Sequence, residues 1–163
     1  MTSKHYLLFL ATILAISSCN KTNNDDNQNS SERAFKNLTD KYFIRTDAVS
    51  APAYPLGNGT SSTDIYHDWY KDPCVLDDLR MFKTNGDYIY DNGATKCDAL
   101  EPQSATLQWA FIENNSKIEV TKGRHKDTLN ILINDGTILK YESKHKNGSS
   151  STIYIWTESW RVK

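Results

Sequence analysis

The sequence predicts an all-β domain, folded as an eight-stranded antiparallel up-and-down β-barrel. Apolar and polar residues alternate along most of the chain, turn-forming pairs separate the alternating runs, and eight such runs follow one another. Closing eight consecutive strands into a barrel removes the exposed edges that an open meander would leave. A two-sheet sandwich is the competing architecture, but it more often needs Greek-key crossovers, for which tight hairpins leave little room.

The alternation has the two-residue period of half-buried strands. In the segment Lys117–Thr121, for example, Ile118 and Val120 are apolar and their neighbours are polar. The eight predicted strands are residues 42–49, 79–83, 88–91, 105–112, 117–121, 128–134, 138–143 and 152–160. On the last of them, Tyr154, Trp156 and Trp160 share one face and Ile153 and Ile155 the other, and the sequence does not fix which face is buried.

Four pairs of turn-forming residues lie between these runs: Asn85-Gly86, Asn114-Asn115, Asp135-Gly136 and Asn147-Gly148. Such pairs tolerate the positive φ angles that tight hairpins require. They indicate that neighbouring strands are joined as hairpins.

The first 19 residues, MTSKHYLLFLATILAISSC, have the pattern of a secretory signal peptide. Lys4 precedes an apolar run that ends at Ile16, and the run is too short to span a bilayer as a helix. The ending Ser17-Ser18-Cys19 resembles the lipobox of bacterial lipoproteins, which implies that Cys19 carries lipid. The resemblance implies a protein of the Gram-negative cell envelope, anchored by lipid to a membrane, most often the outer one. An ordinary signal peptide with an incidental Cys19, or a short buried helix, is the alternative.

The rest of the chain divides into a linker and one domain. Residues 20–34, NKTNNDDNQNSSERA, contain no large apolar side chain and are predicted to be a disordered tether. Residues 35–163 have the length of a single domain. The formal charge of −1 becomes −2 when Lys4 is removed with the leader, and no basic patch indicates a nucleic-acid partner.

Cys74 and Cys97 form an even pair once Cys19 is assigned to lipid. In an exported chain disulfides form and persist, so a Cys74–Cys97 bridge is expected. Two separate buried thiols are the alternative. A zinc site is disfavoured because the sequence has neither a CxxC motif nor paired histidines at ligand spacing.

The segment around these cysteines resembles a known family. Cys74 followed by Asp77-Asp78, then Phe82, Asn85-Gly86-Asp87-Tyr88, Gly93 and Lys96-Cys97, is similar to the "CxxDD...F..NG.Y...G..KC" core of lipocalin-like domains in small Gram-negative lipoproteins. The resemblance covers most of the folded region and implies a lipocalin-like barrel. The Gly-x-Trp of a lipocalin's first strand is absent, since Asp40-Lys41-Tyr42 stands there. Residues 50–71 are expected to add a strand or to fold over the barrel mouth.

Catalysis, a metal and a cofactor are not expected. There is no GxSxG motif and no EF-hand spacing, and His67, His125 and His145 lie in polar segments. The pair Asp77-Asp78 is interpreted as capping a turn rather than as a general acid and base.

Binding of a small apolar or amphipathic ligand in the barrel is the favoured function. A barrel of eight strands either fills with side chains or holds one small ligand. The candidate ligand-binding residues are Phe82, Trp109, Phe111, Tyr141 and Trp69. The alternative function is a non-catalytic envelope adaptor or inhibitor, which docks a protein or glycan through surface aromatics such as Trp69, Tyr70 and Trp156.

Overall fold

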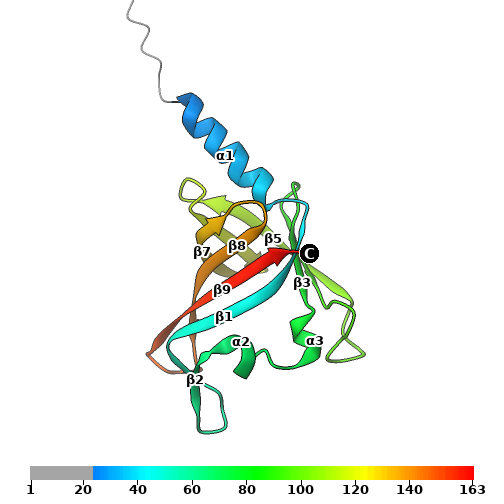
Figure 1. The fold of residues 1–163 in the computed structure, drawn as a ribbon, viewed down its shortest axis with the longest axis vertical. Coiled ribbons are helices and arrows are strands. Elements are labelled where there is room, and N and C mark those ends of the chain that lie inside the picture. Colours follow the sequence, from blue (N-terminus) through cyan, green and yellow to red (C-terminus); the bar gives the residue numbers. More distant parts are fainter. Residues whose placement is uncertain (1–23) are drawn as a thin grey trace, which may run out of the picture.

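The computed structural model describes residues 24–163 (Figure 1), so the predicted signal peptide and Cys19 lie outside the described residues. The helices are α1 (Asn24–Leu38), α2 (Ile65–Asp68) and α3 (Pro73–Leu76). The strands are β1 (Tyr42–Pro55), β2 (Ser61–Asp64), β3 (Leu79–Phe82), β4 (Asp87–Asp91), β5 (Ser104–Ile112), β6 (Lys117–Lys122), β7 (His125–Asn134), β8 (Ile138–Lys146) and β9 (Ile153–Val162).

The strands form one antiparallel sheet that closes on itself. Its order is β2-β1-β3-β4-β5-β6-β7-β8-β9, and β1 also pairs with β9. That closing ladder runs from Phe43 opposite Val162 to Ala51 opposite Ile155. Since β2 pairs only with β1, the other eight strands make the barrel. The predicted eight-stranded antiparallel up-and-down barrel is therefore confirmed.

The segment after the first predicted strand is more ordered than the sequence indicates. β1 continues to Pro55, and β2 folds back on it with Tyr54 opposite Ser62. α2 follows, and its Ile65 is fully buried beside Tyr54 and Trp156. Residues 50–71 thus add the strand β2, whereas the aromatic stretch that ends this segment begins with α2.

The prediction of a disordered tether is wrong for residues 24–34, which belong to α1. The helix is held at its C-terminal half, where Leu38 is fully buried and Phe35 stacks on Trp109 with ring centroids 5.9 Å apart. The Asn134 side chain donates a hydrogen bond of 2.8 Å to the Ala34 carbonyl. Each further residue then adds a hydrogen bond to an existing helix, which is far easier than nucleating one. Composition alone does not reveal this tertiary support.

The C-terminal part of α1 covers one end of the barrel while the rest of the helix projects away from it, and α2 lies near the opposite end (Figure 1). At the covered end the Asn37 side chain donates to the Asn134 carbonyl, and the Lys41 ammonium donates to the Gly136 carbonyl at 3.1 Å. We call this the closed end and the other the open end. The open end carries the β6–β7 and β8–β9 turns and the β4–β5 loop.

The aromatic face of β9 points into the barrel. Trp156 is 4% exposed and Trp160 is 2% exposed, whereas Ile153 on the other face is exposed. This settles the orientation that the sequence leaves open. It also removes Trp156 from any exposed aromatic patch of the kind that the adaptor hypothesis requires.

The disulfide between Cys74 and Cys97 is present, with the Cα atoms 5.1 Å apart. It ties α3 to the β4–β5 loop, as predicted. Asp77 and Asp78 do not cap the turn. Instead, Asp77 accepts hydrogen bonds of 2.9 Å from the backbone of Ala94 and Thr95, and Asp78 accepts one of 2.6 Å from the Tyr90 hydroxyl. Asp77 thus fastens the loop that the disulfide holds, and Asp78 fastens the strand β4 that leads into it.

Candidate functional site

Four of the five ligand-binding residues predicted from sequence belong to the packed core rather than to a cavity. Phe82, Trp109 and Tyr141 are buried, and Phe111 packs against them. The Trp109 ring lies 5.3 Å from both the Phe82 ring and the Phe111 ring. None of the four lines either of the cavities described below. Their contact with a ligand stays a prediction.

Trp69 lies in the segment after α2 and is 44% exposed. Its ring meets Tyr54 edge-on at 5.4 Å and Trp156 at 6.4 Å, so it extends the aromatic cluster of the open end toward solvent. It does not line either cavity.

Two buried arginines occupy the middle of the barrel. The Arg45 guanidinium lies 3.6 Å from the centre of the Tyr70 ring and 4.5 Å from that of Trp160, and its Nε donates to Glu158 at 2.9 Å. Arg80 stacks on the Tyr90 ring at 3.4 Å. These contacts fill the space between the closed end and the open end. Burial raises the pKa of the Tyr70 hydroxyl, which therefore stays protonated at neutral pH.

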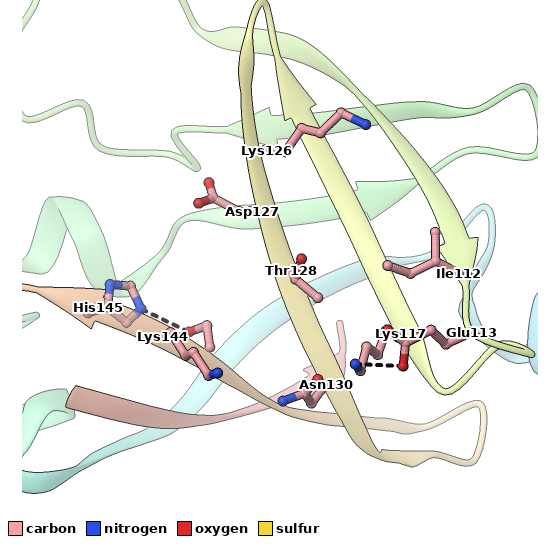
Figure 2. A pocket seen from close by; sticks show the side chains of 10 residues that line it. Ile112, Glu113, Lys117, Lys126, Asp127, Thr128, Asn130, Lys144 and His145 are labelled. Atoms are coloured by element: carbon pink, nitrogen blue, oxygen red, sulfur yellow. Dashed lines mark hydrogen bonds and ion pairs between the residues drawn. The ribbon is translucent and has the colours of Figure 1, made fainter. Parts of the chain in front are cut away.

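A first cavity of about 470 Å³ opens through the barrel wall between β7 and β8 (Figure 2). Asp127 and Thr128 of β7 and Ser143, Lys144 and His145 of β8 are among the residues that line it. Its volume lies within the range of about 300–1,000 Å³ that is usual for small-molecule sites. Most of its lining side chains are polar.

A serine–histidine pair lies in this first cavity. Ser143 Oγ and His145 Nε2 are 2.8 Å apart, and the His145 ring stacks on Trp156 with centroids separated by 4.1 Å. Asp127, which would orient the histidine of a catalytic triad, instead pairs with His125 at 3.0 Å. Burial lowers the pKa of His145, so the ring is neutral at pH 7 and can either donate or accept a hydrogen bond.

A second cavity of about 340 Å³ lies at the open end against β4, β5 and β6. Tyr90, Ala105, Leu107 and Pro102 form its apolar part, and the polar groups beside them are the Asn92 amide, the Lys122 ammonium and the Glu101 carboxylate. Paired residues of neighbouring strands share a face, and Tyr88, which is buried in the core, pairs with Leu107. Tyr90 and Ala105 pair two residues further along, so the apolar part of this cavity faces the barrel interior.

Sequence reasoning missed Tyr90, Ala105, Leu107 and Lys122. Their positions follow from strand parity, because Leu107 and Trp109 lie on one face of the same strand and Val120 and Lys122 on one face of the next. The sequence prediction instead selects the largest aromatic rings as ligand-binding residues. Those rings lie in the core and not in the cavities.

Among residues 24–163, no three His, Cys, Asp or Glu side chains gather as a metal site would require. No helix in this described part of the chain is long and apolar enough to cross a membrane.

Comparisons with known proteins add little to this geometry. No family model matches the chain, and no curated protein matches it. A solved structure described as "Odorant Binding Protein OBP1" is similar over 77% of this chain and 71% of that chain, with a TM-score of 0.40 and 8% sequence identity. A likeness this distant carries no argument about function, which rests on the cavities and the residues that line them.

Proposed function

We propose that this chain is a lipid-anchored envelope protein that binds a small amphipathic ligand at the open end of its barrel. The observation that carries the proposal is the second cavity, where an apolar floor faces the barrel interior and Lys122 stands at the rim. At the closed end, the aromatic core fills the barrel interior and Phe35 of α1 packs against it.

The lining of this cavity favours an amphipathic ligand over a purely apolar one. The apolar part of the ligand would cover Leu107, Ala105 and Pro102, which removes their apolar surface from water at about 25 cal/mol per Å². The ammonium of Lys122 has no ion-pair partner among the described residues, so it is available to an acidic head group. The volume of about 340 Å³ suits a molecule with a medium-length acyl chain.

The lipid anchor remains a proposal that rests on the lipobox-like ending at Cys19. α1 begins at Asn24, soon after Cys19 in the sequence, and its C-terminal end meets the closed end of the barrel (Figure 1). The open end would therefore face away from the membrane. A Cys19→Ser variant expressed with its leader should lose incorporation of an alkyne-tagged fatty acid, and retained labelling would refute the anchor.

Binding is tested with an environment-sensitive probe, a dansyl-labelled undecanoic acid, on residues 20–163 purified in oxidised form. Ala105→Trp fills the second cavity from an exposed position and should abolish the fluorescence increase. Thr106→Trp is the matched control, since it adds the same ring to the outward face of the same strand. Equal binding by both variants, or no binding by the unmodified protein, would refute the proposed site.

A further inference from the structure

β7 and β8 are joined over only part of their length. Their ladder extends from Asn134 opposite Leu139 to Asn130 opposite Glu142 and stops there. Beyond that point residues 125–129 of β7 pair only with β6, and residues 143–146 of β8 pair only with β9. Figure 2 shows the two strands diverging, with the first cavity between them.

Each strand therefore presents a free edge to this opening. Backbone N–H and C=O groups on such an edge are a template for another strand. The β8 edge is well supported, because Ser143 to Lys146 stay paired with Trp156 to Ile153 on the other side. A supported edge loses little conformational freedom when a further strand adds to it.

The lysines around the opening differ in whether they have an ion-pair partner. Lys144 and Lys146 point outward from β8, since the buried Ser143 lies on the opposite face, and neither has an ion-pair partner among the described residues. The lysines on the other side of the opening are already neutralised. Lys117 pairs with Glu113 at 2.6 Å, and Lys126 pairs with Glu119 at 2.7 Å.

The inward side of the same edge differs in chemistry. Ser143 and His145 line the first cavity from the inward face, where the Trp156 ring stacks against His145, and Lys144 lines it from the outward face. An added strand would place alternate side chains on the two faces of the barrel wall. Acidic side chains would meet Lys144 and Lys146 outside, and small apolar ones would enter the cavity.

We propose that the free edge of β8 binds an extended acidic segment of a partner protein by strand addition. Main-chain hydrogen bonds to residues 143–146 supply the affinity, and the lysine pair with the cavity supplies the preference for alternating acidic and apolar residues. This site is separate from the second cavity, so it does not depend on the proposed small-molecule function.

The test uses a capped peptide of sequence Glu-Val-Glu-Val-Glu-Val and amide chemical shifts of the isotope-labelled protein. We expect shifts in residues 143–146 and in the facing part of β7. Two further peptides carry N-methyl groups, one on its valines and the other on its glutamates. One of these two should not bind, because methylation removes the donors on one edge of the strand while leaving every charge in place.

Protein variants separate the charge contribution from folding. Lys144→Glu combined with Lys146→Glu should weaken binding on the order of tenfold, since two attractions become repulsions at exposed sites. Lys140→Glu is the control, because it reverses the charge of one lysine on the outward face of β8 where that strand is paired with β7. Peptide binding to Lys140→Glu should stay within about twofold of that to the unmodified protein. Residue 140 lies further from the free edge, and salt screens the interaction of exposed charges over about a Debye length.

Three results would overturn the proposal. Both methylated peptides could bind as tightly as the parent, which would exclude main-chain pairing. The parent peptide could cause no shift at millimolar concentration, or shift only the residues of the second cavity. The protein could also self-associate, and both methylated peptides could displace that self-association. This result would assign the free edge of β8 to a second copy of the chain.

Discussion

Replacing Glu158 by leucine removes one partner of the buried ion pair in the middle of the barrel. The side chains of Arg45 and Glu158 are 6% and 7% exposed, and their Nε and Oε2 atoms are 2.9 Å apart. Arg45 Nη1 already lacks a hydrogen-bond partner among the described residues. The variant therefore leaves a buried guanidinium whose remaining support comes from the rings of Tyr70 and Trp160.

The expected loss of unfolding free energy is about 3–5 kcal/mol, the usual result of removing one partner of a buried pair. The double variant Arg45→Met with Glu158→Leu removes both charges and should recover most of that loss. It forfeits two cation–π contacts of about 2 kcal/mol each, but it also removes the desolvation cost of two buried charges, which is several kcal/mol per ion. The double variant should thus be more stable than Glu158→Leu alone.

The assay is urea unfolding followed by tryptophan fluorescence, with the four tryptophans of the chain as reporters. Glu142→Leu on the outward face of β8 is the control and should change stability by about 0.5 kcal/mol or less. A loss of unfolding free energy below about 1 kcal/mol for Glu158→Leu would refute the reasoning, because a buried charge without its partner destabilises the folded state by more than that. So would a double variant that is less stable than the single one.

Three further predictions concern stability. Reducing the disulfide, which spans 23 residues, should lower the unfolding free energy by about 3 kcal/mol, and an unchanged urea midpoint would contradict this. Gly93→Ala should be clearly less stable than Gly59→Ala by thermal unfolding: both glycines have positive φ, but a Cβ at Gly93 would meet the Asp77 carbonyl carbon at 2.7 Å, whereas Gly59 faces open space. Burial raises the pKa of Tyr70 and Tyr141 above that of an unfolded tyrosine, so their contribution is complete below pH 10 and is lost as pH rises further. Stability that stays constant from pH 9 to pH 12, measured by urea unfolding, would contradict the last prediction.

The barrel was predictable because local signals determine most of it. The pairs Asn85-Gly86, Asn114-Asn115, Asp135-Gly136 and Asn147-Gly148 all lie in connections between consecutive strands. Positive φ is found at Gly86, Asn115, Gly136 and Gly148, as such turns require. The helix α1 was not predictable in this way, because its support comes from residues such as Trp109 and Asn134 that lie far along the chain.

The interior charges illustrate the same limit. Arg45 shares the inward face of β1 with Phe43, and Glu158 shares that of β9 with Trp160. Parity alone places both inward, but polar residues in an alternating pattern are normally assigned to solvent. Only the β1–β9 ladder, which joins residues 113 positions apart, shows that each charge has its partner. For a related reason, the size of an aromatic ring does not distinguish a core position from one that lines a cavity.

The ladder between β1 and β9 also determines when the barrel can be completed. This ladder joins the first and the last strand of the chain. The barrel therefore cannot close until the ten residues of β9 are available. Contacts of such long sequence separation form slowly. A nascent or truncated chain that lacks β9 would expose the edges of both β1 and β8 and leave Arg45 without Glu158. Pairing of β9 therefore closes the sheet and neutralises its buried charge in the same step. Until this strand pairs, the chain is an intermediate with exposed strand edges, which is prone to aggregate.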